Sequence, residues 1–331
     1  MEVAAIVAAV GLAFVFGTSD APNATSALVA ARAAPWHAAL AFSFALHALG
    51  ALAGGTAVAL TMTTLIHVPT NDLPSVIAAA CLASIVFVAG AARLGIPTSA
   101  TYGLIGSLVG GALVVGGPHD IRWGGFHGLR PYGVLGTLAG VILSPIVGVA
   151  VGWAARRAAI RATARATRRV LRPVRGAIWL AAGLVALSDG TNDGQKAMGV
   201  SAAVLVAAGS LHRFVIPLWL RVAVALALAL GTVAGGGRVV RRVVRGYYRP
   251  GPLDSLAAQV SSAGVILGAA AVGAPVSTST VVASSVVGAG ADRHPRHVRW
   301  EGVVQTISAW FLTVPACGLM AAVFVACQRL A

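Results

Sequence analysis

The chain has few charged residues and almost no lysine. Only 10% of its 331 residues are Asp, Glu, Lys or Arg, whereas soluble domains average about 25%. Nine residues are acidic, and Lys196 is the single lysine beside 23 arginines. Hydrophobic residues make up 58% of the chain, and long apolar stretches recur from one end to the other. This composition argues against a soluble domain and predicts an all-α polytopic membrane protein.

The sequence also lacks the motifs of several enzyme classes. It contains no P-loop, no glycine-rich dinucleotide fingerprint and no His-Glu-x-x-His zinc motif. No nucleophile–base constellation stands out, so we expect no enzyme, no resident cofactor and no step driven by ATP. The three cysteines, Cys81, Cys317 and Cys327, lie in apolar segments without metal-ligand spacing, which favours buried packing positions.

The apolar segments fall into two sets of five. A crossing helix needs about 20 apolar residues. Two of the segments, 97–116 and 275–290, are short and begin at proline, which makes them candidates for re-entrant segments. We therefore expect about 10–12 membrane segments, some of them broken or re-entrant. The ten segments are 2–34, 38–62, 74–94, 97–116, 131–153, 177–208, 213–234, 253–273, 275–290 and 302–327.

Positive charge gathers between the apolar segments. Eight arginines lie between 156 and 175, and further arginines lie within 238–249 and 293–299. This distribution is typical of the positive-inside rule and of contact with anionic lipid headgroups, and it does not indicate nucleic acid. With the arginines inside, five crossings per half place both chain termini outside.

Two motifs recur in the same order in the two halves. GTSDAPNA at 17–24 aligns without gaps with GTNDGQKA at 190–197, and PTSATYGLIGSLVG at 97–110 aligns with PVSTSTVVASSVVG at 275–288. The offset between aligned residues is 173 for the first motif and 178 for the second. Because each half crosses the membrane an odd number of times, the duplication predicts two inverted-topology repeats with broken helices at the polar motifs.

The duplication also predicts how the chain divides. Residues 1–155 would form the first inverted repeat and residues 177–331 the second. The arginine-rich segment 156–176 would then be a basic cytoplasmic linker. Polar motifs at matching places in two inverted halves predict a binding site near the middle of the bilayer.

The first motif brings carboxylates into apolar segments. An uncompensated Asp at that depth costs about 2.5–3.5 kcal/mol on insertion scales. A bound Na⁺ or a proton would offset this cost, and Na⁺ prefers oxygen ligands of the Asp and Asn kind. A hydrogen-bond network that only stabilises the helices is the alternative. The predicted coupling-ion residues are Asp20, Asn23, Asp189, Asn192 and Asp193, with Asp20, Asn23, Asn192 and Asp193 as the ligands if the ion is Na⁺.

The second motif places hydroxyl groups directly after a proline. This order suits the first turn of a helix, where free N–H groups and the positive end of the dipole favour an anion. Two such turns from opposite halves could clamp a tetrahedral oxyanion, whereas N-capping or small-residue packing is the alternative. The hydroxyl residues are Ser99, Thr101, Ser277, Thr278 and Ser279.

Lys196 follows Asp193 by three residues inside an apolar segment. On a helix this spacing puts the two side chains on one face. Lys196 could pair with Asp193 or Asp189, or contribute positive charge toward the anion, with the amide of Gln195 beside it; a lysine that snorkels to the end of a span is the alternative. His47 also lies within a span, where a packing role is favoured over a proton pathway.

Taken together, these motifs resemble the inorganic phosphate transporter (PiT) family, also called the phosphate permeases, over roughly residues 10–325. GTSDAPN and DGTNDGQK resemble the family's paired signatures G-x-N-D-x-x-N and H-G-x-N-D-x-x-K, and PTSATY and PVSTST resemble its P-x-S-[ST]-[ST]-H elements. The chain departs from these patterns at Ser19, Ala100, Tyr102, Asp189 and Thr280.

The resemblance implies a secondary active symporter of the cell membrane that moves inorganic phosphate with Na⁺ or H⁺ by alternating access. It matches the Asp and Asn residues above to the family's coupling-ion region and the hydroxyl residues to its anion-binding hairpins. Transport of sulfate or another tetrahedral oxyanion, and a membrane receptor or scaffold without transport, are the alternatives. The expected partners are phosphate, the coupling ion and the lipid bilayer; whether the chain forms a homo-oligomer stays open.

Overall fold

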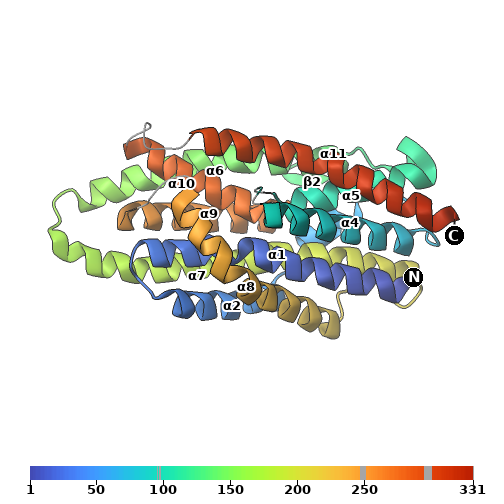
Figure 1. The fold of residues 1–331 in the computed structure, drawn as a ribbon, viewed down its shortest axis with the longest axis horizontal. Coiled ribbons are helices and arrows are strands. Elements are labelled where there is room, and N and C mark those ends of the chain that lie inside the picture. Colours follow the sequence, from blue (N-terminus) through green and yellow to red (C-terminus); the bar gives the residue numbers. More distant parts are fainter. Residues whose placement is uncertain (95, 97, 247–250, 294–299, 331) are drawn as a thin grey trace.

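In the computed structural model, the described part of the chain is a bundle of α-helices (Figure 1). It comprises residues 1–330 except 95, 97, 247–250 and 294–299. The helices are α1 (Glu2–Ala30), α2 (Trp36–Ala53), α3 (Ala57–Thr63), α4 (Leu73–Leu94), α5 (Ala100–Gly116), α6 (Gly133–Thr163), α7 (Leu171–Ala207), α8 (Leu218–Gly246), α9 (Pro252–Ala271), α10 (Thr278–Arg293) and α11 (Trp300–Leu330). A small antiparallel hairpin of β1 (Gly125–His127) and β2 (Arg130–Tyr132) precedes α6, with Gly125 opposite Tyr132.

Nine helices of the described chain are long and apolar enough to cross a membrane. The tenth apolar segment that the sequence indicates corresponds to α10, whose apolar stretch Thr278–Ala291 is shorter. Large apolar side chains such as Val7, Leu143 and Leu230 are exposed on the outside of the bundle, where lipid would cover them. The chain is therefore an all-helical, multi-pass membrane protein.

The two halves of the sequence are interlocked. Each of four helices from the first half of the sequence packs along a helix from the second half: α1 along α8, α2 along α7, α5 along α11 and α6 along α10. Each of these pairs joins a helix that begins before the arginine-rich segment with a helix that ends after it. Residues from both 1–155 and 177–331 therefore contribute to the same buried apolar clusters within the described chain.

The expected breaks at GTSDAPNA and GTNDGQKA are absent, and this part of the prediction was wrong, whereas α5 and α10 do begin within the second motif of each half. α1 is helical throughout 17–24, and α7 is helical throughout 190–197. The glycine that opens each motif instead allows two helices to approach closely. A Cβ on Gly17 would meet the main-chain carbonyl of Leu228 in α8, and a Cβ on Gly190 would meet that of His47 in α2.

The arginine-rich segment 156–176 is largely helical. α6 continues to Thr163 and α7 begins at Leu171, so only a short turn separates them. Arg156 is buried, and its Nε donates to Asp254 Oδ1 in α9 over 2.6 Å, because a buried guanidinium needs an anionic partner.

The cysteines differ in exposure. Cys81 and Cys317 are buried, as the sequence predicts. Cys327 is exposed, because it lies in the last turns of α11, and its predicted burial was wrong.

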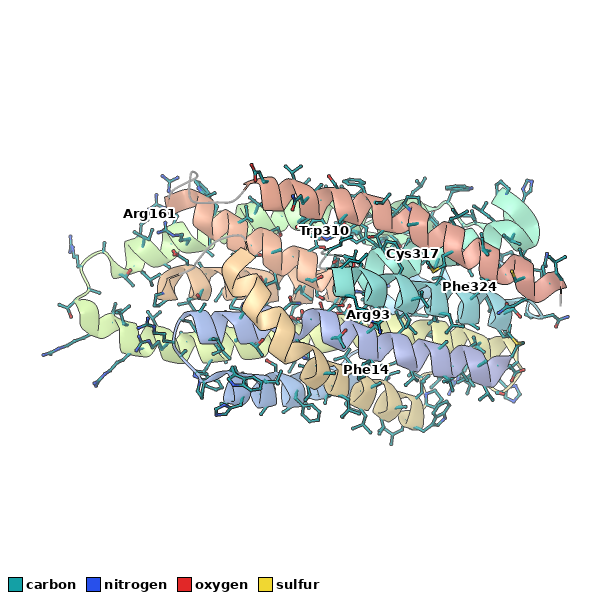
Figure 2. The ribbon with its side chains drawn as sticks, in the orientation of Figure 1. Phe14, Arg93, Arg161, Trp310, Cys317 and Phe324 are labelled. Carbon is teal, nitrogen blue, oxygen red and sulfur yellow. The ribbon has the colours of Figure 1, made fainter. Side chains whose placement is uncertain are left out.

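Two helical hairpins enter the bundle from opposite ends (Figure 1). α4 and α5 lie at the end that also holds both chain termini, whereas α9 and α10 lie toward the α6–α7 connection. Arg161 marks that second end in Figure 2. The residues that precede α5 and α10 meet inside the bundle, where Ser99 and Ser277 are both buried.

Candidate functional site

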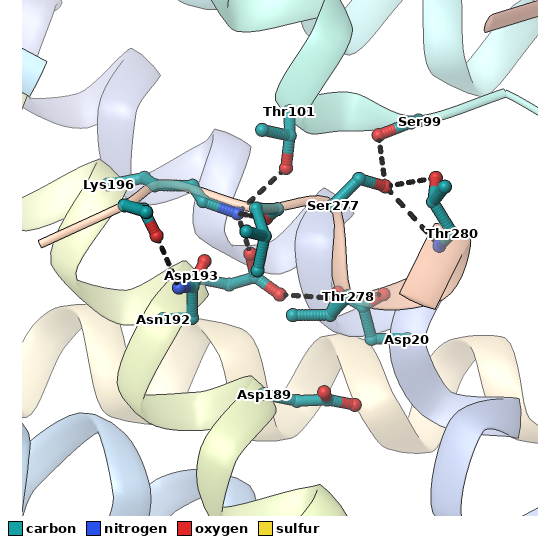
Figure 3. A network of polar contacts seen from close by, with 12 residues as sticks. Asp20, Ser99, Thr101, Asp189, Asn192, Asp193, Lys196, Ser277, Thr278 and Thr280 are labelled. Carbon is teal, nitrogen blue, oxygen red and sulfur yellow. Dashed lines mark hydrogen bonds and ion pairs between the residues drawn. The ribbon is translucent and has the colours of Figure 1, made fainter. Parts of the chain in front are cut away.

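The starts of α5 and α10 touch each other through hydroxyl groups (Figure 3). Ser99, the residue before α5, donates from Oγ to Ser277 Oγ over 2.8 Å. Ser277 Oγ in turn shares a hydrogen bond of 2.6 Å with Thr280 Oγ1 in the first turn of α10. The sequence predicts that these two proline-led segments meet, and the structure places them together.

Thr278 connects the hydroxyl groups to the carboxylates. Its Oγ1 lies 2.9 Å from Asp20 Oδ1 in α1 and 3.0 Å from Asp193 Oδ2 in α7. Both Asp side chains are buried, and they occupy the same position of the two aligned motifs. A hydroxyl group carries a single proton, so Thr278 can donate fully to only one carboxylate at a time.

Lys196 lies at the centre of the network. Its Nζ donates to Asp193 Oδ1, to Thr101 Oγ1 over 2.8 Å and to the main-chain carbonyl of Val276 over 2.5 Å. The side chain is fully buried, and its Nζ lies 5.3 Å from the ring centroid of Phe16. An ammonium group has three protons, and these three acceptors use all of them. Lys196 therefore links α7 to the segments at the start of both α5 and α10.

Asn23 joins the first motif to a second carboxylate. Its Nδ2 donates to Asp20 Oδ1 over 3.1 Å and to Asp189 Oδ2 over 2.9 Å. Behind it, Gln259 Nε2 in α9 donates over 2.8 Å to the main-chain carbonyl of Asn23. His47 Nε2 in α2 lies 3.7 Å from the same oxygen, Asp189 Oδ2.

Several buried oxygen atoms next to this network have no hydrogen-bond partner within the described residues. They are Asp189 Oδ1, Asn192 Oδ1 and Gln259 Oε1. Asn192 uses its Nδ2 on the main-chain carbonyl of Ala274 over 3.3 Å, which leaves its oxygen available. Unpaired buried oxygens of this kind are costly, and they fit the ligand preference of a hard cation such as Na⁺.

The electrostatic balance of the site is negative. Three buried carboxylates, those of Asp20, Asp189 and Asp193, face the single ammonium group of Lys196. When all three carboxylates are ionised, two negative charges remain uncompensated. Burial of uncompensated charge is expensive, so cations or protons are required to balance the site.

Two of the predicted site residues lie outside this network. Gln195 points toward the break between α2 and α3, where its Oε1 accepts from Val58 N over 2.9 Å. Ser279 is half-buried and makes none of the described hydrogen bonds. Helical geometry explains both cases, because neighbours of Lys196 and Thr278 point in other directions from the axis. The other ten predicted residues, Asp20, Asn23, Ser99, Thr101, Asp189, Asn192, Asp193, Lys196, Ser277 and Thr278, gather in one buried region.

The sequence interpretation missed part of this environment. Gln259 was not singled out, although an amide in an apolar segment is a signal that could have identified it. His47, for which the sequence favours a packing role, lies beside Asp189, and its Nδ1 contacts Thr232 Oγ1 over 2.9 Å. Ser19, one of the departures from the family pattern, bonds back to the carbonyl of Val15 over 3.1 Å and does not join the network.

The comparisons with known proteins agree with this geometry. The sequence profile described as "Phosphate transporter family" matches residues 16–321. The chain is 33% identical over 319 residues to a probable low-affinity inorganic phosphate transporter of Mycobacterium bovis, covering 96% of this chain and 75% of that protein. It is 29% identical over 323 residues to a protein of the same description from Bacillus subtilis, covering 96% of this chain and 94% of that protein.

A solved structure shares the fold. "The sodium-dependent phosphate transporter" matches with a TM-score of 0.84 and 19% sequence identity over 99% of each chain. Together with the family match and the relatives, these findings identify the class of protein. The chain belongs to the phosphate transporter family, and it is a multi-pass membrane transporter of inorganic phosphate rather than an enzyme.

Proposed function

We propose that the chain is a Na⁺-coupled phosphate symporter in which phosphate binds between the starts of α5 and α10. The observation that carries this proposal is the buried contact between Ser99 and Ser277, 2.8 Å between their Oγ atoms. Two helix starts face each other there, and each offers main-chain N–H groups without partners in its own helix. The hydroxyl groups of Ser99, Ser277 and Thr280 bond to one another, and a bound phosphate would replace these bonds.

The proposed phosphate ligands are the hydroxyl groups of Ser99, Thr101, Ser277 and Thr278, and Ser279, which lies outside the network, is not among them. Thr101 is the most instructive, because its Oγ1 accepts a hydrogen bond from the Lys196 ammonium. Its own proton is then free to be donated to an anion, and the nearby positive charge strengthens such a bond. Lys196 would thus act on phosphate through Thr101, since its own three protons are already used.

The proposed coupling-ion site lies next to the phosphate ligands, at Asp20, Asn23, Asp189, Asn192 and Asp193. The unpaired Asp189 Oδ1 and Asn192 Oδ1 support a cation there. The solved structure with the same fold is named as a sodium-dependent phosphate transporter, which favours Na⁺ as this cation. Two like unit charges about 4 Å apart repel by about 4 kcal/mol at an effective dielectric constant of 20. Na⁺ bound among these carboxylates would remove this repulsion between them and the incoming phosphate, which is the physical basis of coupling.

The proposed cycle is alternating access by two inverted repeats, residues 1–155 and 177–331. The helix contacts support it, because they pair as expected for a two-fold relation. If α1 corresponds to α7 and α2 to α8, the α1–α8 contact maps onto the α7–α2 contact. In the same way the α5–α11 contact maps onto the α10–α6 contact. α4–α5 and α9–α10 would then be re-entrant hairpins that open toward opposite sides of the membrane.

The proposed orientation places both chain termini outside the cell. The α6–α7 connection, with Arg157 and Arg161, lies at the end of the bundle opposite to the termini (Figure 1). Because basic connections favour the cytoplasmic side, the termini belong to the outer side.

The direct test is uptake of radiolabelled phosphate into proteoliposomes with the Na⁺ and pH gradients imposed separately. The proposal predicts accumulation driven by an inward Na⁺ gradient, and its loss in Asp20→Asn and Asp193→Asn variants that are still folded. Arsenate should inhibit phosphate uptake, because arsenate and phosphate are alike in size and protonation. Sulfate should not inhibit it. Uptake that follows only the pH gradient would refute Na⁺ coupling.

A further inference from the structure

Lys196 and Asn23 occupy the same position in the two aligned motifs. In GTSDAPNA and GTNDGQKA, Asn23 aligns with Lys196, and each follows the aligned Asp20 or Asp193 by three residues. In the structure each side chain reaches its own Asp. Asn23 Nδ2 donates to Asp20 Oδ1 over 3.1 Å, and Lys196 Nζ donates to Asp193 Oδ1. The two halves of the site are therefore built alike, but one contains a neutral amide and the other a fixed positive charge.

The surroundings of the Lys196 ammonium are those of a cation site. Nζ is held by a carboxylate oxygen of Asp193, the hydroxyl oxygen of Thr101 and the main-chain carbonyl of Val276. These are three kinds of oxygen ligand that Na⁺ takes in proteins. The side chain is fully buried. The ammonium thus stands where a free cation could be bound by the same oxygens.

The other half of the site has carboxylates but no attached cation. Asp20 and Asp189 are both buried, and Asn23 donates to both of them. Asp189 Oδ1, which lacks a hydrogen-bond partner within the described residues, belongs to the same carboxylate that Asn23 contacts. The half of the site around Asp20 therefore needs a positive charge that can exchange, whereas the half around Asp193 already contains the Lys196 ammonium.

We infer that Lys196 is a tethered cation that occupies one of two symmetry-related cation positions, so this chain binds one Na⁺ fewer than an arrangement with Asn in both motifs. The inference rests on the proposed Na⁺ coupling and deepens it by setting the number of ions. It also gives Lys196 a second effect. Because the ammonium bonds to Thr101 and to the carbonyl of Val276, both helix starts remain attached to α7 whether Na⁺ is present or not.

The experiment counts bound ²²Na⁺ per molecule of purified protein at saturation, in the presence of phosphate, which requires no transport. The Lys196→Asn variant, which recreates the first motif in the second half, should bind one more Na⁺ than the wild type. The Lys196→Arg variant keeps the charge and should bind the same number as the wild type. The mirror variant Asn23→Lys places an ammonium beside Asp20 and should bind one fewer.

A second readout covers the case in which Lys196→Asn is unstable. The lost ammonium leaves Asp193 buried without its cation, so Na⁺ should raise the thermal unfolding temperature of this variant more than that of the wild type. Equal Na⁺ counts for wild type and Lys196→Asn, or a variant that Na⁺ does not stabilise beyond the wild type, would overturn the inference. Wild-type protein that binds no Na⁺ at all would instead refute the proposed Na⁺ coupling, so the two failures are distinguishable.

Discussion

Thr278 offers the sharpest test of the contact between the hydroxyl groups and the carboxylates. Its side chain bridges Asp20 and Asp193 with oxygen–oxygen distances of 2.9 and 3.0 Å. Thr278→Val keeps the shape of the side chain and removes the hydroxyl group. Hydrogen bonds to charged groups contribute about 1.5–3 kcal/mol, and each 1.4 kcal/mol corresponds to about tenfold. We therefore expect the phosphate uptake of this variant to fall by about 10–150-fold.

The matched control is Thr278→Ser, which retains the hydroxyl group and loses only a methyl group. It should keep most of the uptake. Both variants are assayed as purified protein in proteoliposomes with an inward Na⁺ gradient, and their thermal unfolding is measured in detergent to confirm folding. If Thr278→Val transported within about twofold of the wild type, the bridge between the two carboxylates would not be part of the site, because the loss of a hydrogen bond to a charged group has a larger effect.

Further expectations concern packing and ion pairs. Arg156→Ala leaves Asp254 buried without its guanidinium and should cost about 3–5 kcal/mol of unfolding free energy. Arg329 is 42% exposed in its ion pair with Asp72, and Arg329→Ala should cost about 0–1 kcal/mol. Gly106→Leu would push into the main chain of α11 and should cost about 1–3 kcal/mol, whereas Gly264→Leu faces open space and should cost less. Detergent thermal unfolding measures all four, and equal losses within either pair would contradict the stated contacts.

Much of the site could be predicted because duplication is visible in the sequence. Polar residues in apolar segments are expensive, so their presence at matching places in both halves indicated a shared buried site. The prolines before the hydroxyl clusters predicted that helices start there, and α5 and α10 begin at Ala100 and Thr278. Ten of the twelve predicted site residues gather accordingly.

The errors have physical reasons. The sequence predicts broken helices at the polar motifs, but the glycine that opens the first motif permits close packing of a continuous helix, as at Gly17 and Gly190. A single sequence does not distinguish these two outcomes. Gln195 points toward the break between α2 and α3. The sequence does not predict this break, because it contains no proline and no charged residue. The helical structure of much of the arginine-rich segment follows from its composition, because alanine and arginine are both good helix formers.

The most direct test of the central claim uses cysteines at the two helix starts. Ser99 Oγ and Ser277 Oγ are 2.8 Å apart, so a disulfide between cysteines at these positions can form with little movement. In a background without the exposed Cys327, oxidised Ser99→Cys/Ser277→Cys protein should not transport phosphate, reductant should restore uptake, and phosphate with Na⁺ should slow the cross-linking. Uptake by the fully cross-linked protein at the rate of the reduced protein would contradict the claim that phosphate passes between these helix starts.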